Sequence, residues 1–202
     1  IRQVQNFLTS LWLSYDNAVD FNLGFLEVSE SYKPPMISSN NIAVSYSNSK
    51  GLDDLLTLNR EQLRDTRLNR LNLWGNFPDF SSTLDTDLLD YAQYNRSLKP
   101  FRIDDSLNRC FFYLNFARSE TLLPVKISQY CICLECLFST DTTELAHKVS
   151  ERVAFFLESE GFNKLEVYND VKIAYKIRSS VVHGSIMPKK AKDLDSISEK
   201  CD

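Results

Sequence analysis

The sequence predicts a mainly α-helical fold with a small α+β appendage at its N-terminal end. The chain has 202 residues, of which 43% are hydrophobic and 12% aromatic, so it can form a packed core. Its five glycines and six prolines are few for an all-β protein, which needs many tight turns. Apolar residues also recur at helical spacing from residue 52 onwards. One helical domain with an appendage accounts for these features.

The appendage is predicted to span residues 1–50 and to be the end of an upstream domain. Residues 4–12 carry apolar side chains at helical spacing, which predicts a short amphipathic helix. Every second residue in 21–25 and in 42–46 is apolar, which is typical of strands. Residues 38–41 read Ser-Ser-Asn-Asn and are expected to form a loop. A boundary near Gly51 then separates the appendage from a helical domain over residues 51–202.

The first three helices of the helical domain are predicted from their start residues. Asn59 and Gln62 have the spacing of a capping box, in which each side chain bonds the backbone N–H of the other residue. A second helix is predicted over residues 82–94, with a serine as its cap. Asp104 or Asp105 is expected to cap a third helix, which carries a stripe of apolar residues.

Three more helices follow. Pro124 suits the first turn of the fourth, which is apolar on most of its surface and should therefore be central. A capping box at Asp141–Glu144 is expected to start the fifth helix, which ends by Gly161. The sixth is predicted over about residues 165–182, and Gly184 suits the left-handed residue that ends it.

The charge of the chain is not that of a nucleic-acid coat. The formal net charge is −4, so any contact with RNA needs a local basic site or a partner subunit. Lys189, Lys190 and Lys192 form a modest basic patch, which solvation explains as well as RNA contact does. They lie in residues 189–202, which could be a frayed tail or a helix. No run of about 18 apolar residues is present, so no membrane span is expected.

The five cysteines are expected to be reduced thiols in the core of a cytoplasmic protein. Cys131, Cys133 and Cys136 lie too close together for a disulfide framework. Within a helix, positions 131 and 133 point about 160° apart, which does not suit a shared zinc ion. The sequence also has no P-loop and no HExxH pattern. No cofactor and no metal are therefore predicted.

The best clue to function is Arg178 and His183, near the end of the sixth predicted helix. Five residues of helix correspond to about 500° of rotation and about 7.5 Å of rise, so the two side chains point about 140° apart. They converge if the helix unwinds near His183, or if the site lies in a groove. The alternative is a surface arginine beside a helix-terminal histidine that the helix dipole stabilises.

Three segments resemble the Apea-like branch of the HEPN superfamily, in the same order and spacing. They are Leu134–Phe138, Glu144–Ala154 and Tyr175–Gly184, and the last contains the R-x4-H motif at Arg178 and His183. The resemblance covers residues 122–184, and residues 52–121 are compatible with the preceding helices. The family often has Asn, Asp or His after the arginine, whereas this chain has Ser179, which cannot act as an acid or base.

The resemblance implies a HEPN-type helical bundle that acts as a metal-independent endoribonuclease. Arg178 and His183 would be catalytic, with Ser179, His147 and Glu144 in support. RNA would be the substrate, attacked through its 2′-OH, and two copies would form a homodimer or a higher oligomer. Such domains serve abortive-infection, antiphage or toxin systems, so an upstream sensor domain is possible. The alternatives are a catalytically degenerate HEPN domain for dimerisation or RNA binding, and a purely structural helical domain.

Overall fold

The computed structural model describes residues 2–20, 23–28, 36–41, 45–74, 106–140, 143–186 and 193–202. In these residues the chain is mainly helical, which confirms the predicted class, while the HEPN-type arrangement stays a prediction. The described helices are α1 (Arg2–Ser14), α2 (Arg60–Trp74), α4 (Ser106–Ser119), α5 (Leu123–Phe138), α6 (Leu145–Glu158), α7 (Lys164–His183) and α8 (Leu194–Cys201).

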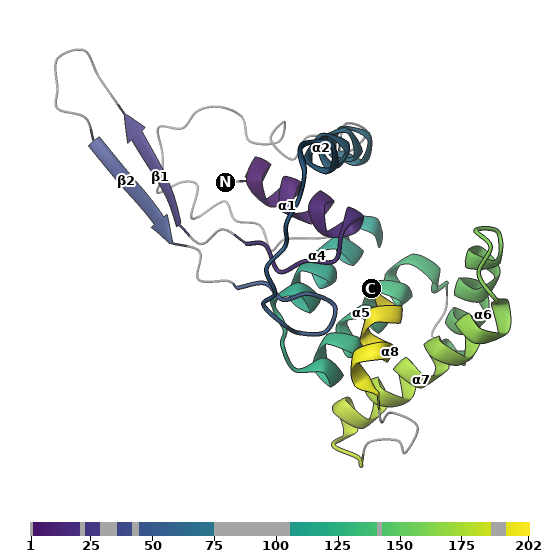
Figure 1. Ribbon diagram of the computed structural model, residues 1–202. Coiled ribbons are helices and arrows are strands. Elements are labelled where there is room, and N and C mark those ends of the chain that lie inside the picture. The colour runs from purple at the N-terminus through teal and green to yellow at the C-terminus, as the bar shows by residue number, and fades with distance from the viewer. Residues whose placement is uncertain are drawn as a thin grey trace.

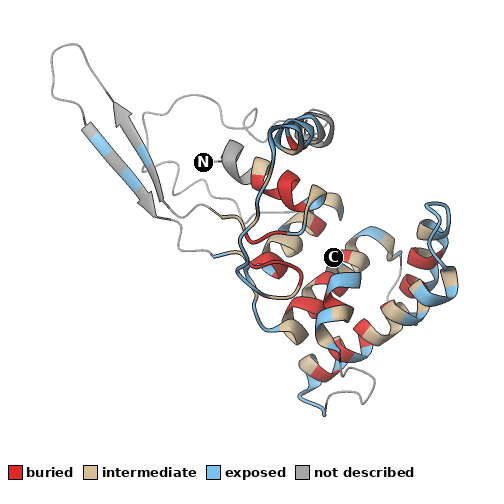
Figure 2. Cartoon of the chain, viewed as in Figure 1, coloured by how far each residue is buried: buried red, intermediate tan, exposed pale blue. Residues whose placement is uncertain are grey.

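Helix α5 lies at the centre of the helical part and contacts α4, α6, α7 and α8, as predicted (Figure 1). Its Ile127 and Cys131 are fully buried. Figure 2 shows buried residues along the faces where these helices meet. The largest apolar cluster joins four helices, and its buried members are Ile127, Cys131, Val149, Val153, Val171, Ala174, Tyr175, Ile177 and Ile197.

Several predicted helix ends are confirmed. The Asn59 and Gln62 side chains each accept a hydrogen bond from the backbone N–H of the other residue, both at 2.9 Å, ahead of α2. Pro124 lies in the first turn of α5, and Gly184 ends α7 in the left-handed conformation with φ 63°. In the polar C-terminal segment, Leu194–Cys201 form helix α8 and not a frayed tail, because Ile197 is buried against the core. Lys189, Lys190 and Lys192 lie outside the described residues.

The capping box predicted at Asp141–Glu144 is wrong. Helix α6 begins at Leu145, so Glu144 precedes the helix instead of being its third residue. Glu144 adopts the left-handed conformation with φ 51°, and among the described residues its side chain makes no capping hydrogen bond. Thr143 is not helical either, which fits the low helix propensity of β-branched residues. Asp141, and the caps predicted at Ser82, Asp104 and Asp105, lie outside the described residues.

Two strands, β1 (Leu23–Val28) and β2 (Met36–Asn41), pair antiparallel, with Leu23 opposite Asn41 and Val28 opposite Met36. The pair points away from the helices in Figure 1. The first strand overlaps the prediction at residues 21–25 in its described part, residues 23–25. The second strand covers the Ser-Ser-Asn-Asn segment assigned to a loop. Of the strand predicted at residues 42–46, residues 45 and 46 are not in a strand, and residues 42–44 lie outside the described residues. Strand formation depends on the pairing partner more than on intrinsic propensity. Pairing with β1 therefore places the Ser-Ser-Asn-Asn residues in a strand, although these residue types are more common in loops.

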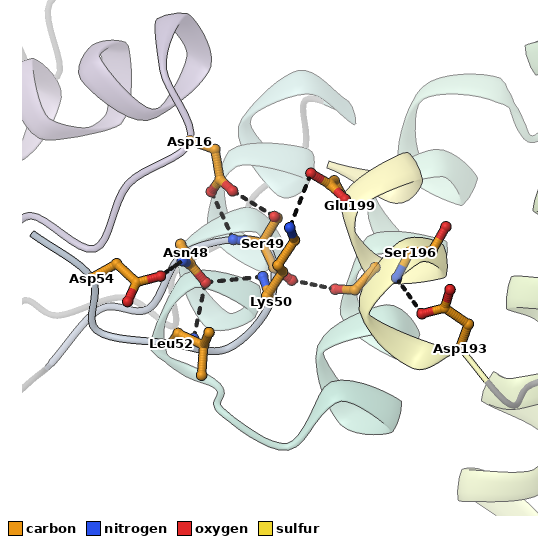
Figure 3. Close-up of polar contacts among 10 residues, drawn as sticks. Asp16, Asn48, Ser49, Lys50, Leu52, Asp54, Asp193, Ser196 and Glu199 are labelled. Atoms are coloured by element: carbon orange, nitrogen blue, oxygen red, sulfur yellow. Dashed lines mark hydrogen bonds and ion pairs between the residues drawn. The ribbon is translucent and has the colours of Figure 1, made fainter. Parts of the chain in front are cut away.

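The loop at residues 45–52 contacts Asp16, two residues after the end of α1, and helix α8 (Figure 3). The Ser49 N–H and hydroxyl donate to the Asp16 carboxylate, and the Ser198 hydroxyl of α8 donates to the Ser49 carbonyl oxygen at 2.5 Å. Lys50 forms an ion pair with Glu199 at 3.4 Å. The predicted domain boundary near Gly51 stays a prediction, and these contacts cross it.

Two fully buried cations hold the N-terminal residues against α4 and α5. The Arg118 guanidinium lies over the Trp12 ring at 4.4 Å and over the Tyr46 ring at 4.2 Å. The Lys126 Nζ donates to the Ala117 carbonyl oxygen at 2.6 Å and to the Ser47 hydroxyl at 3.1 Å. Lys126 is therefore compensated by oxygen acceptors, and Arg118 mainly by two aromatic faces, because its Nε and Nη1 have no hydrogen-bond partner among the described residues.

Burial lowers the pKa of Arg118 to about 10 and the pKa of Lys126 to about 8. The nearby Asp202 carboxylate opposes both shifts. This carboxylate accepts hydrogen bonds from the Trp12 Nε1 at 2.7 Å and from the Tyr130 hydroxyl at 2.9 Å. The C-terminal end of α8 thus takes part in the same network as α1 and α5.

The buried Lys126 should make stability depend on pH. Its pKa is about 8 in the folded state, against 10.5 for an exposed lysine, so from about pH 8 to about pH 10 the unfolded state binds more protons. The contribution of Lys126 to the free energy of unfolding therefore rises with pH in this window. We expect the stability difference between the wild type and Lys126→Met to shift in favour of the wild type from about pH 7 to about pH 9.5.

Urea denaturation of both proteins at the two pH values measures this shift. The buried cysteines and tyrosines titrate in the opposite direction, but their effect cancels in the difference between the two proteins. A difference that stays constant with pH would show that Lys126 does not titrate in this window.

Candidate functional site

A pocket of about 240 Å³ lies between the C-terminal half of α7 and the first turn of α6. Its mixed lining of apolar, phenolic, cationic and imidazole groups is suited to a ligand with both apolar and anionic parts. The lining residues are Leu145, Ala146, Tyr175, Arg178, Ser179, Val182 and His183.

Helix α7 brings the predicted residues Arg178, Ser179 and His183 to this pocket. Ser179 and His183 are four residues apart and lie in one row of the helix surface, while Arg178 and Val182 form the adjacent row. The helix stays regular through His183. Of the two ways in which Arg178 and His183 could meet, the structure therefore has the groove, whose other wall is the start of α6.

His183 is the last residue of α7, and its side chain is exposed. The helix ends there because Gly184 takes the left-handed conformation and its N–H bonds the Ser180 carbonyl oxygen. An imidazole in this position can exchange protons with solvent and can reach a ligand in the groove.

Arg178 forms an ion pair with Glu135 of α5. The Nη1–Oε1 distance is 3.2 Å and the Nη2–Oε2 distance is 3.4 Å, and the two side chains are 29% and 18% exposed. The Arg178 Nε is buried and, among the described residues, has no hydrogen-bond partner. The pair holds the guanidinium at the pocket through its two terminal nitrogens.

Glu135 was not assigned a role from the sequence, although it lies in one of the segments that resemble the family. It is the one acidic residue in the sequence of α5, a helix whose surface is otherwise largely apolar. A lone carboxylate in a central helix needs a cationic partner, and this is the observation that could have identified it.

Tyr175 lies between the pocket and the core. Its side chain is buried within the main apolar cluster, and burial raises the pKa of its phenol, with the negative charge of Glu135 adding to the shift. Tyr175 is therefore a neutral phenol at any physiological pH. It can line the pocket or donate a hydrogen bond, but it cannot act as a base.

The predicted supporting residues His147 and Glu144 are not among the residues that line this pocket. The His147 Nδ1 lies 2.9 Å from the Tyr168 hydroxyl, and the two rings meet edge to face. Glu144 precedes α6 in a left-handed conformation. Their neighbours Leu145 and Ala146 line the pocket instead, so α6 contributes an apolar wall.

The five cysteines are free, and Cys110, Cys131 and Cys133 are buried, as the sequence predicted. Cys131 packs in the main cluster, while the Cys133 thiol lies 3.4 Å from the Cys110 carbonyl oxygen on α4. The two neighbouring thiols of α5 thus face different helices. In the ranges that the structure describes, no group of His, Cys, Asp and Glu could hold a metal ion.

The fold and the pocket define a mainly helical protein with an Arg–Ser–His groove at the end of a long helix. No protein-family model, curated protein or solved structure matches the chain. Among the helices of the described residues, none combines the length and the apolar character needed to cross a membrane.

Removal of the Arg178 cation should destabilise the fold through Glu135. Arg178→Met leaves the Glu135 carboxylate unpaired while it is only 18% exposed, at a cost of about 1–3 kcal/mol. The double variant Arg178→Met/Glu135→Gln removes the orphaned charge and should recover part of that loss. Urea denaturation near neutral pH measures both effects. Equal destabilisation of the single and double variants would show that the charge of Glu135 carries no penalty.

Proposed function

We propose that the chain is a metal-independent endoribonuclease module of HEPN type. The observation that supports this best is that Arg178, Ser179 and His183 line one pocket. The first and last of these form the R-x4-H motif, and one ligand in the pocket could contact both. The groove lies at the surface, where a single-stranded or looped RNA could enter.

The residue types suit cleavage by attack of the 2′-OH on the adjacent phosphorus. The O–P bond forms, the bond to the 5′-oxygen breaks, and the products are a 2′,3′-cyclic phosphate and a 5′-OH. One proton leaves the 2′-OH and one reaches the 5′-oxygen, and an imidazole such as His183 can carry either. The Arg178 guanidinium stays charged and can hold two phosphoryl oxygens as negative charge develops. The Ser179 hydroxyl supports them with a hydrogen bond.

A homodimer is part of the proposal. One histidine and one arginine are few for two proton transfers and the stabilisation of a phosphorane, and two chains would supply two of each. The resemblance to HEPN domains also places the module in an abortive-infection, antiphage or toxin-type protein of the cytoplasm, with a sensor upstream. These biological roles rest on the resemblance alone.

The second candidate is a HEPN domain that has lost catalysis and serves for dimerisation or RNA binding. The Arg178–Glu135 ion pair favours this candidate, because it offsets the charge that would stabilise the phosphorane. Ser179 favours it as well, since a hydroxyl cannot replace an acid or base at this position.

Cleavage of RNA in the presence of EDTA tests the two candidates. We expect the wild type to release fragments with 2′,3′-cyclic phosphate ends, and His183→Ala and Arg178→Ala each to lower the rate by about 10²-fold or more. His147→Ala is the matched control, because it removes the other histidine of the chain, which bonds Tyr168 and does not line the pocket. Equal cleavage by all four proteins, or by none, would contradict the catalytic proposal.

The oligomeric state provides an independent prediction. A site completed by a second chain requires association, so light scattering should give the mass of a dimer or larger assembly at the concentrations used for the cleavage assay. A strict monomer at high concentration would contradict the composite site, even if the chain cleaves RNA.

A further inference from the structure

We propose that the pocket between α6 and α7 is a subsite for a nucleobase, in which the base of the reacting nucleotide packs between Val182 and the apolar start of α6. This subsite deepens the proposed ribonuclease function and rests on it for the identity of the ligand. It assigns the apolar part of the pocket to the base, beside the residues proposed for the phosphate and the protons.

Val182 is an apolar residue that α7 exposes inside the pocket. Its side chain is 63% exposed, whereas its neighbour Val181 packs against the main apolar cluster. The contact between α7 and the core therefore does not depend on Val182. An apolar side chain that lines a pocket and remains open to water gains free energy when an apolar ligand surface covers it.

The wall formed by α6 is apolar as well. Leu145 and Ala146 line the pocket, whereas the polar residues on either side of them, Glu144 and His147, do not. The Leu145 and Ala146 side chains offer no hydrogen bond to a phosphate or a hydroxyl, but they can pack against a flat ring. Enzymes that act on a single nucleotide hold its base between apolar or aromatic side chains in the same manner.

The size of the pocket suits one base. Its volume of about 240 Å³ is smaller than the roughly 300–1,000 Å³ of sites that hold drug-sized ligands. A base in a duplex would have to leave its stack to enter, which costs free energy, whereas an unpaired base is already accessible. The subsite therefore favours unpaired nucleotides.

The polar residues of the pocket lie beside this apolar part. Ser179 and His183 are exposed, and they form the row of α7 next to the row that contains Val182. A base against Val182 shares the pocket with the imidazole, so its ribose would lie where His183 can accept the proton of the 2′-OH. The apolar wall thus positions the reacting sugar through its base.

Two ligands that differ only in the base isolate its contribution. Adenosine 3′-monophosphate and methyl ribofuranoside 3-phosphate share the sugar and the phosphate, and NMR titration of the protein measures both dissociation constants. We expect the wild type to bind the nucleotide about tenfold more tightly, because the base covers apolar surface of the pocket. Val182→Asn places a polar amide at the wall and should reduce this ratio to about twofold, with the affinity for the sugar phosphate unchanged.

The matched control is Leu165→Asn. Leu165 is 68% exposed, belongs to the first turn of the same helix and does not line this pocket, so the variant should keep the wild-type ratio. Circular dichroism shows whether both variants are folded. If Val182→Asn does not fold, Val182→Ala replaces it and should lower the ratio by about threefold, since it removes only part of the apolar surface.

Contact with a second copy of the chain is the competing explanation for the exposed Val182. A ratio near one in the wild type, or an unchanged ratio in the folded Val182 variant, would overturn the base subsite. An unchanged ratio together with a fall in mass to that of a monomer would assign Val182 to an interface between copies instead.

The subsite and the ribonuclease activity fail separately. A wild type whose preference for the nucleotide is lost in the Val182 variant, but which cleaves no RNA, would support the subsite and overturn the ribonuclease proposal. Cleavage of RNA by a wild type that binds both ligands equally would support the ribonuclease and overturn the subsite.

Discussion

The structure depends on the way α5 satisfies its two charged residues. Lys126 and Glu135 are nine residues apart, which corresponds to about 900° of rotation, so they emerge from opposite sides of the helix. Lys126 bonds the Ser47 hydroxyl and the end of α4, while Glu135 holds Arg178 of α7. The surface between them packs into the main apolar cluster. The two charges therefore fix the orientation of α5 about its own axis, because a rotated helix would bury a charge without a partner.

The same constraint explains why the N-terminal residues are packed into the helical part. Arg118 and Lys126 are fully buried, and the groups that compensate them include Trp12, Tyr46 and Ser47. Without those groups, two cations would face either water or apolar surface at the junction of α4 and α5. The N-terminal residues thus complete the environment of cations that belong to the helices. Burial of charge at this cost is tolerated where specific partners from several segments define one arrangement.

The features that the sequence predicted correctly are those decided by neighbouring residues. The reciprocal capping of Asn59 and Gln62, the proline in the first turn of α5 and the glycine after α7 each depend on contacts within a few positions. One local prediction failed, the capping box ahead of α6, because Glu144 is left-handed and precedes the helix. Two other features were missed because they depend on partners outside their own segment. The second strand forms at Met36–Asn41 because it pairs with β1, and the Arg178–Glu135 pair joins positions 43 residues apart. For the site, the sequence could nominate Arg178, Ser179 and His183, but not the acid that holds the arginine.

The groove also resolves the geometric difficulty of an arginine and a histidine five residues apart on one helix. The two side chains point in different directions, so on an isolated helix they would not share a ligand. The start of α6 provides a second wall, and a ligand between the walls can contact both rows of α7. The two side chains differ in how they are held. The ion pair with Glu135 holds the charged guanidinium of Arg178 in place, whereas His183 is exposed at the end of the helix, where its proton can exchange with water. The proposed ribonuclease chemistry needs one cation held in place and one proton carrier in contact with water, and α7 carries a candidate for each within its last two turns.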